Sequence, residues 1–320
     1  MSKILAWPLS DGRLQIWAIR RPDGLSTCWK ETTDPNAAWT PWQDHKGAPP
    51  FTLEVRSAAT LANGALQLFV GAAGPGPVGG GFLLTTWKVS GESTAQWSDW
   101  QGLSMDDTTP PNEALTDFSA GSLTDGRIQV FAPTTFGPNR ERFLTRWQQG
   151  VNEPMSWSRT TDFAPFRSAD SVTAIHLSDG RLQLIAGSDN GLMTTWKLDT
   201  QSSGPWQPWQ PFAPFYNTSG GGAKVHWGRL SDGRPQLFAL DRFGSLKTSW
   251  KATTESWSAW TAWVPFEGAP TNVKSFSAAP LSDGRLQLWA VDDRRRCFST
   301  WKANTNPNSA WVPWQGFAMP

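Results

Sequence analysis

Five lysines and ten tryptophans recur in this chain at fixed spacing and have the chemistry to bind a ligand. Each lysine directly follows one tryptophan, and another tryptophan lies thirteen residues after that first one. The lysines are Lys30, Lys88, Lys197, Lys251 and Lys302, the preceding residues are Trp29, Trp87, Trp196, Trp250 and Trp301, and the later ones are Trp42, Trp100, Trp209, Trp263 and Trp314. An indole ring can stack on the apolar C–H face of a ligand, and an ammonium group forms a favourable cation–π contact over an indole ring. This set is the candidate ligand-binding set.

One repeat of the pattern is incomplete. Trp147 is followed by Gln148 instead of a lysine, and Thr160 stands thirteen residues after it. A further tryptophan, three residues before the later position, occurs in all six repeats: Trp39, Trp97, Trp157, Trp206, Trp260 and Trp311. Because this tryptophan and the one before the lysine persist in the degenerate repeat, we expect them to be packing residues. The joint loss of the lysine and the later tryptophan suggests that they share a contact or a site, and predicts that the third repeat lacks a competent one.

Strands must position these side chains. Each repeat contains an apolar run, an Asp-Gly or Asn-Gly pair such as Asp283-Gly284, and an alternating run such as residues 285–291. Such pairs favour a two-residue type I′ hairpin turn, and the alternation predicts a β-strand. A third strand ends at the first tryptophan, and a fourth contains the tryptophan pair. Pro41, Pro208 and Pro313 lie within that pair, which predicts an edge strand because proline cannot donate to a ladder.

Six such units predict an all-β chain, a single six-bladed β-propeller with four antiparallel strands per blade. We expect one domain over residues 1–320, with blades at about 1–47, 48–103, 104–166, 167–215, 216–267 and 268–320. No strand has to be donated between the first and last units, so side-chain packing should join them. The length varies in the connection between the second and third strands, for example at 71–81, and in the connection from the fourth strand to the next unit, for example at 104–116. Residues 220–222 are interpreted as a flexible glycine loop.

Several polar residues recur in the units, and we interpret most of them as structural. An arginine follows five of the turn glycines, and we expect it to buttress the turn or cap carbonyl groups. A glutamine recurs on every second strand, for example Gln236, and is expected to bridge neighbouring blades as a buried amide. A Thr or Ser lies two residues before each third-strand tryptophan, where ligand binding and packing remain alternatives.

Composition excludes several function classes. The net charge is +1 and the pI is about 7.8, which gives no footprint for nucleic acid or anionic lipid. No apolar stretch is long enough to span or insert into a membrane, and no secretory signal is recognisable. We therefore expect synthesis in the cytoplasm without a classical signal peptide, with release by a non-classical route left open. Cys28 and Cys297 are too few for a disulfide framework and are not expected to pair.

The sequence offers no catalytic or metal-binding constellation. His45, His176 and His226 lie at non-equivalent places in the repeat, and no metal-ligand spacing, phosphate-binding loop or nucleophile elbow is present. We predict a protein that is not an enzyme, with no catalytic residue, no metal site and no cofactor.

Each unit resembles the tectonin-like repeats of bacterial propeller lectins, especially the Photorhabdus fucose-binding lectins. The matching elements are the short strand, the glycine turn, the RLQLW-type strand, the tryptophan-containing strand and the terminal WxxW. The resemblance covers all six units, although those lectins have seven blades. It implies multivalent binding of glycans, fucosylated or O-methylated, in shallow sites at or between blades, and a homo-oligomeric assembly. The alternative is a protein-interaction scaffold that binds a polypeptide on its variable loops.

Overall fold

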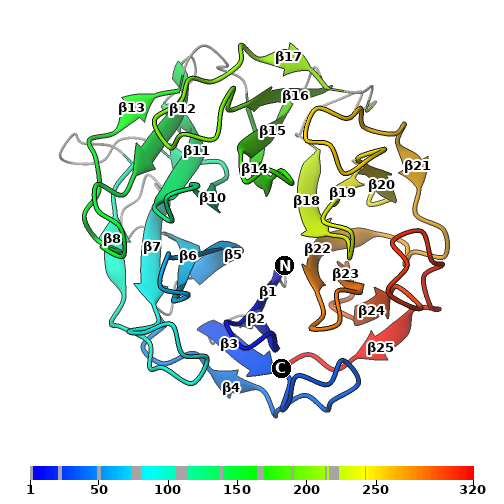
Figure 1. Cartoon of the computed structure of the whole chain (residues 1–320). Coiled ribbons are helices and arrows are strands. Elements are labelled where there is room, and N and C mark those ends of the chain that lie inside the picture. The colour runs from blue at the N-terminus through cyan, green and yellow to red at the C-terminus, as the bar shows by residue number, and fades with distance from the viewer. Residues whose placement is uncertain are drawn as a thin grey trace. The chain divides into compact units, whose positions relative to one another are not determined.

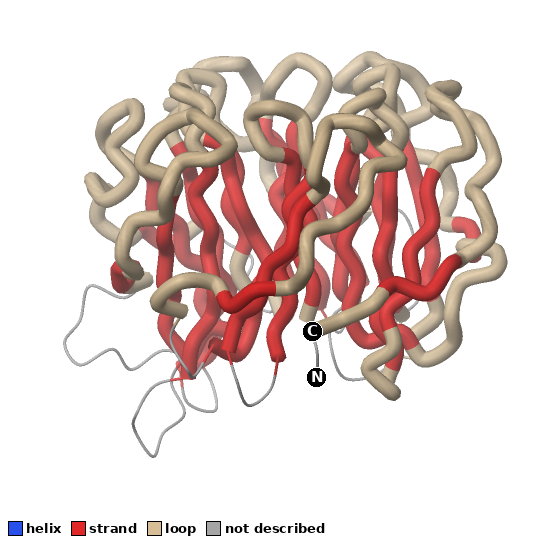
Figure 2. The backbone as a smooth tube through the Cα atoms, turned by 90° about the horizontal axis from the view of Figure 1, so that it is seen from below, coloured by secondary structure: helices blue, strands red, loops and turns tan. Residues whose placement is uncertain are grey.

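The structure is a computed structural model, which describes residues 3–20, 24–48, 52–73, 81–105, 114–136, 140–163, 169–188, 191–212, 215, 223–241 and 243–320. Every regular element in these ranges is a β-strand (Figure 2). None of the described residues belongs to a helix that could cross a membrane. Residues 74–80, 106–113 and 220–222, which include most of the variable connections, lie outside the described part.

Six antiparallel sheets follow one another along the chain (Figure 1). The first sheet holds β1 (Ile4–Pro8), β2 (Leu14–Arg20), β3 (Gly24–Trp29) and β4 (Gln43–Asp44), and the second holds β5 (Thr52–Thr60), β6 (Leu66–Ala73), β7 (Gly81–Trp87) and β8 (Gln101–Leu103). The third holds β10 (Ser119–Ser122), β11 (Ile128–Phe136), β12 (Arg140–Trp147) and β13 (Thr161–Asp162), with β9 (Ala114–Leu115) paired to β11. The fourth holds β14 (Ser171–His176), β15 (Leu182–Ser188), β16 (Gly191–Trp196) and β17 (Gln210–Pro211).

The fifth sheet holds β18 (Lys224–Arg229), β19 (Pro235–Leu240), β20 (Leu246–Trp250) and β21 (Val264–Pro265), and the sixth holds β22 (Val273–Pro280), β23 (Leu286–Asp292), β24 (Cys297–Trp301) and β25 (Gln315–Phe317). Six four-stranded blades, each with its strands in sequence order, define the fold class predicted from the repeat, a six-bladed β-propeller.

The chain divides into two compact units, each made of three sheets. One unit contains Met1–Pro50 with His226–Pro320, and the other contains Phe51–Val225. Within the first unit, β1 packs beside β22, and the backbone N–H groups of Ile4 and Ala6 donate to the hydroxyls of Ser275 and Ser277 at 3.2 and 2.9 Å. The first and sixth sheets thus meet by packing and side-chain hydrogen bonds without sharing a strand, as predicted. The single-domain organisation stays a prediction.

The hairpin between the first two strands differs from the predicted type I′ turn. In the first sheet, the N–H of Gly12 donates to the carbonyl of Leu9 at 2.9 Å, and the N–H of Leu9 donates to the carbonyl of Arg13 at 2.7 Å. Gly12 has φ of 86°, whereas Asp11 has no positive φ. The loop therefore has three residues, a type I turn followed by a left-handed glycine, which is the other common hairpin solution. The same pattern holds at the five equivalent glycines, Gly64, Gly126, Gly180, Gly233 and Gly284.

The aspartate of this turn explains why it recurs. Asp283 accepts the N–H of Arg285 on one carboxylate oxygen at 3.0 Å and the Nε–H of the same arginine on the other at 2.6 Å. In the fifth sheet, the equivalent Arg234 also donates from Nη1 to the carbonyls of Lys251 and Ala252. The predicted role of these arginines, to buttress the turn and cap carbonyl groups, is confirmed.

The fourth strand is an edge strand, as its prolines predicted, but it is interrupted. In the sixth sheet, Trp311 forms an isolated bridge with Lys302, and regular pairing resumes only at β25. Between them, the N–H of Val312 donates to the carbonyl of Trp301 at 2.9 Å, while Pro313 has no N–H to donate. The prediction of one continuous fourth strand that contains the tryptophan pair is therefore wrong, because a break separates the bridge at Trp311 from β25.

Within each unit, the turn between the first and second strands of one sheet contacts the loop after the third strand of the next sheet. Both connections have a constant length in the sequence. The hydroxyl of Ser231, in the first hairpin turn of the fifth sheet, donates at 2.5 Å to the carbonyl of Thr305, in the loop after β24 of the sixth. Ser282 and Thr124 donate in the same way to the carbonyls of Thr33 and Thr200 on their neighbouring sheets. These contacts explain the constant length of the two connections, because each loop must reach the turn of the sheet beside it.

Candidate functional site

Each recurrent lysine fastens the loop that leads to the tryptophan pair of its own sheet. The five lysine side chains are buried, with 5 to 8 % of their surface exposed. Lys197 Nζ donates to the carbonyls of Ser202 and Gly204 at 2.7 and 3.1 Å, and lies 5.3 Å from the ring centroid of Trp206. The other four lysines make equivalent bonds and lie 4.9 to 5.1 Å from the matching ring.

This geometry corrects one sequence-based hypothesis. We expected the lysine to share either a cation–π contact or a site with the later tryptophan of the pair, because both are missing from the third repeat. The ammonium instead lies over the earlier tryptophan, which the third sheet keeps as Trp157. The cation–π alternative is therefore wrong for these lysines, and the shared site stays a prediction.

The earlier tryptophan of the pair packs on the preceding sheet, as predicted. Trp311 of the sixth sheet lies 5.9 Å from Phe238 and 5.1 Å from Phe266 of the fifth, measured between ring centroids. Trp39, Trp157 and Trp206 pack in the same way on Trp289, Phe69 and Phe131. Phe69, Phe131, Phe238 and Trp289 are fully buried on the second strands of their sheets. These tryptophans form the hydrophobic contact between successive sheets, here called the seam.

Three of the later tryptophans, Trp42, Trp209 and Trp314, pack at the same seams and are half-buried. Trp314 lies 5.8 Å from Phe266, and Trp209 lies 5.6 Å from Phe143. Trp42 donates its Nε1–H to the carbonyl of Ala318 at 2.9 Å. Trp100 and Trp263 are half-buried as well. The third-strand tryptophans Trp29, Trp87, Trp147, Trp196, Trp250 and Trp301 are also half-buried.

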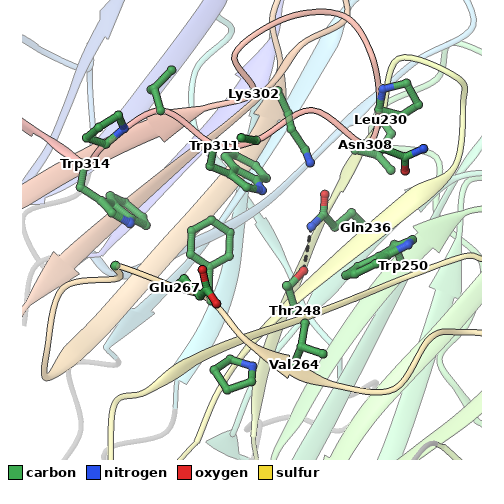
Figure 3. Close-up of a pocket in the computed structure, with 17 residues that line it drawn as sticks. Leu230, Gln236, Thr248, Trp250, Val264, Glu267, Lys302, Asn308, Trp311 and Trp314 are labelled. Atoms are coloured by element: carbon green, nitrogen blue, oxygen red, sulfur yellow. Dashed lines mark hydrogen bonds between the residues drawn. The ribbon is translucent and has the colours of Figure 1, made fainter.

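A cavity of about 700 Å³ lies in the seam between the fifth and sixth sheets, within a single unit (Figure 3). We call it the 5–6 cavity. Its aromatic walls are Trp250 from β20, Phe266 after β21, and Trp311 and Trp314 before β25. Three members of the candidate ligand-binding set, Trp250, Trp314 and Lys302, therefore meet around one space. They come from two adjacent sheets, so neither sheet alone makes the site.

Unused hydrogen-bonding groups border this cavity. Gln236, which is 3 % exposed, donates from Nε2 to Thr248 Oγ1 at 2.8 Å, while its Oε1 has no hydrogen-bond partner among the described residues. The buried Nε1 of Trp314 also has no partner within the described part of the chain. Buried polar atoms are normally paired, because leaving one without a partner costs about 1–3 kcal/mol. One unused acceptor and one unused donor therefore border a space between aromatic walls.

Lys302 supplies the positive charge of the cavity. Its Nζ donates to the carbonyl of Ser309 at 2.9 Å and lies 4.9 Å from the ring of Trp311. Burial, together with the nearby charge of Arg234, lowers the pKa of Lys302 to about 8. Arg234 is held by Asp232 and donates from Nη2 to Oδ1 of Asn308, another lining residue.

Equivalent positions in the other seams are occupied differently. Between the second and third sheets, Gln148 Nε2 donates to Gln67 Oε1 at 2.9 Å, so the glutamine oxygen that is unused in the 5–6 cavity is satisfied there. Between the third and fourth sheets, Phe143 stands where the fifth sheet has the smaller Leu246, and it packs on Trp209. Between the sixth and first sheets, the indole N–H of Trp42 is already bound to Ala318.

The recurrent glutamine was predicted to bridge neighbouring blades, but most copies bond within their own sheet. In every sheet its amide donates to the Thr or Ser hydroxyl on the third strand of the same sheet, at 2.8 to 3.2 Å. Among the glutamine bonds described, those that bridge two sheets belong to Gln67, whose Oε1 accepts from Gln148 and whose Nε2 donates to the carbonyl of Pro154 at 3.1 Å. Sequence reasoning therefore missed Gln236 as a cavity residue, although its occurrence in every unit was a signal of a fixed environment.

Other candidate groups lie outside the cavity. His176 hydrogen-bonds through Nε2 with the carbonyl of Ser122, and His226 through Nδ1 with that of Trp227. The described residues contain no group of three His, Cys, Asp or Glu side chains that could hold a metal ion. Cys28 and Cys297 are both free and buried in one apolar cluster of the first and sixth sheets, and burial raises the pKa of Cys297 to about 12.

No protein-family model matches the sequence, and no curated relative matches it. Similar folds occur among solved structures. A mutant of the Aleuria aurantia lectin in complex with Fucα1-6GlcNAc aligns with a TM-score of 0.62 at 12 % identity over 99 % of this chain and 94 % of that chain. The SapL1 lectin in complex with α-methyl fucoside aligns with 0.62 at 11 % over 100 % and 96 %. The NanB sialidase of Streptococcus pneumoniae aligns with 0.62 at 11 % over 96 % and 77 %. At these identities the likeness shows the propeller fold.

Proposed function

We propose that this protein is a carbohydrate-binding propeller, a lectin, and that the 5–6 cavity is one of its sugar sites. The observation that carries the proposal is the combination of Trp250, Trp311 and Trp314 around a space that also contains the unused Gln236 Oε1 and Trp314 Nε1. A sugar ring fits this combination, because its C–H face stacks on indole while its hydroxyls both donate and accept hydrogen bonds.

For the repeated sites taken together, the proposed ligand class is a fucosylated or O-methylated glycan. Two of the similar structures are lectins solved with a fucoside, and the repeat resembles that of the Photorhabdus fucose-binding lectins. Both a fucose methyl and an O-methyl group add apolar surface, which suits a site walled by tryptophan and phenylalanine. The specificity for these glycans is part of the proposal and rests on the resemblance and on the aromatic walls together.

Repetition makes the binding multivalent in this proposal. A single open site with a few hydrogen bonds binds weakly, whereas several sites on one rigid protein bind a glycan-coated surface with much higher avidity. The candidate set occurs in five repeats, and the third repeat lacks two of its members. The Gln148–Gln67 bond supports the expectation that the seam between the second and third sheets does not bind sugar.

The proposed protein is not an enzyme, although one similar structure is a sialidase. The 5–6 cavity contains one carboxylate among its lining residues, Glu267, and this side chain is exposed. Glycoside hydrolysis generally uses a pair of carboxyl groups that flank the scissile bond. The chemistry of the lining residues therefore fits binding better than hydrolysis.

Red-cell agglutination tests this proposal directly. We expect the purified protein to agglutinate red cells and free α-methyl fucoside to inhibit the agglutination, because only a multivalent sugar-binding protein crosslinks cells in a sugar-dependent way. No agglutination, together with capture of one specific polypeptide partner, would contradict the lectin proposal and favour the protein-interaction scaffold.

A further inference from the structure

The lysine of the sixth repeat differs from the other four in its charge environment. The loops after Lys30, Lys88, Lys197 and Lys251 each place a carboxylate two or four residues later, and these are Asp34, Glu92, Asp199 and Glu255. The loop after Lys302 has asparagine at both positions, Asn304 and Asn306. The sixth repeat therefore keeps the buried ammonium and lacks the acidic residue that accompanies it elsewhere.

The carboxylate matters where it is present. Asp34 and Asp199 favour the charged forms of Lys30 and Lys197, so each partly offsets the lowering of the lysine pKa by burial. The charged group that acts on Lys302 is Arg234, which adds to the effect of burial. Glu267 also lines the 5–6 cavity, and its side chain is exposed. The cavity thus contains a buried cation whose own loop supplies no counter-charge.

We infer that the 5–6 cavity binds an acidic saccharide, a sugar ring that carries a carboxylate, with Lys302 as the counter-charge. This inference rests on the proposed function, since it gives one of the proposed sugar sites a ligand class of its own, beside the fucosylated or O-methylated glycans proposed for the set. Lys302 Nζ has three N–H groups, and its one described acceptor is the carbonyl of Ser309. A carboxylate at the cavity accepts from this ammonium. Gln236 Oε1 is left to accept a ring hydroxyl.

Geometry separates this seam from the one between the sixth and first sheets. There the equivalent lysine, Lys30, has Asp34 in its loop, and the indole N–H of Trp42 is bound to Ala318. The lysine of that seam thus has a nearby carboxylate in its own loop, which Lys302 lacks. The preference for an acidic sugar therefore belongs to the 5–6 cavity.

The test compares methyl β-glucuronide with its methyl ester by titration calorimetry on the full chain. The two ligands share the ring and differ in one charge. We expect the acid to bind about tenfold more tightly than the ester, as a partly buried ion pair of about 1.4 kcal/mol would give. Equal affinities of the acid and the ester would overturn the inference.

Asn306→Asp is the informative variant, because it places a carboxylate where Asp34 lies in the first repeat. The aspartate keeps the oxygen that accepts the N–H of Asn308 at 2.9 Å, so the loop should fold as before. We expect the preference for the acid to fall below about twofold and the affinity for the ester to stay unchanged. Asn36→Asp, an equal charge change on the exposed loop of the first repeat, is the matched control and should keep the preference.

The outcomes separate the two proposals. Binding of the ester and the acid with equal affinity, or an unchanged preference in Asn306→Asp, overturns the acidic-ligand inference and leaves the lectin proposal standing. Failure of every saccharide, acidic or neutral, to bind the wild-type chain overturns the lectin proposal itself.

Discussion

Replacing Trp311 by alanine tests the division of the tryptophans into packing and ligand-binding groups. Trp311 packs on Phe238 and Phe266 of the preceding sheet and lies under the ammonium of Lys302. Its removal opens the hydrophobic contact between the fifth and sixth sheets and leaves a buried lysine without its aromatic partner. We therefore expect the substitution to destabilise the fold as well as to affect ligand binding.

The magnitude follows from the contacts. Truncating a large aromatic side chain in a packed core costs about 3–5 kcal/mol. Each aromatic pair adds about 0.5–1.5 kcal/mol beyond the buried area, and a cation–π contact adds about 0.5–1 kcal/mol when exposed and about 2 kcal/mol when desolvated. Trp311 is half-buried and makes two such pairs and one such contact, and these terms overlap with the cost of truncation. We expect a loss of about 3–5 kcal/mol in the free energy of unfolding.

Urea unfolding followed by circular dichroism measures this loss. Trp257→Ala is the matched control, because Trp257 is 78 % exposed and the same substitution there should change stability by less than about 0.5 kcal/mol. Trp314→Ala should cost less than Trp311→Ala, since Trp314 makes one of the described aromatic pairs instead of two. A Trp311→Ala protein as stable as the Trp257→Ala protein would refute the packing role.

Three further outcomes are expected. Gln148→Leu should lower the free energy of unfolding by about 1–3 kcal/mol in a urea titration, because it leaves the buried N–H of Ile128 and Oε1 of Gln67 without their partners; a loss below about 0.5 kcal/mol would contradict this. Ser282→Ala removes the bond to the Thr33 carbonyl and should cost about 1 kcal/mol in the same assay, whereas no loss would show that this link between sheets contributes nothing. The affinity for methyl β-glucuronide should be full below the lowered pKa of Lys302 and fall as the pH rises through about 8, while the affinity for the ester stays constant; a parallel fall of both would contradict the ion pair.

The repeat made the strand order, the edge position of the fourth strand and the packing role of the earlier tryptophan predictable from the sequence. Each of these features depends on residues that recur in every unit, so the same local interactions are expected in all six units. The turn type was not predictable in the same way, because Asp-Gly serves both the two-residue and the three-residue hairpin. Here the Asp283 carboxylate stabilises the three-residue form by binding the N–H and the guanidinium of Arg285.

The candidate site depends on residues that differ between repeats, and an alignment based on the residues that repeats share does not show what these differences do. Phe143 and Leu246 are both apolar and align with each other, yet only Phe143 brings an aromatic ring against the later tryptophan of the next sheet. Gln148 reads as a lost lysine in the sequence, whereas the structure shows it bound to Gln67 across the seam. The seam that combines Trp250, Gln236, Lys302 and Trp314 becomes visible only when two neighbouring sheets are placed together.

A glycan array probed with the wild-type chain and with Trp314→Ala tests the central claim most directly. Trp314 lines the 5–6 cavity and contributes an unused indole N–H, so its removal takes away both a stacking surface and a donor. Trp257→Ala again serves as the control, because it removes an exposed tryptophan that is not among the lining residues. We predict that the wild-type and Trp257→Ala proteins bind a defined group of glycans and that Trp314→Ala loses at least part of that group. An array without signal for the wild-type chain, or an identical pattern for all three proteins, would contradict the assignment of the 5–6 cavity as a sugar site.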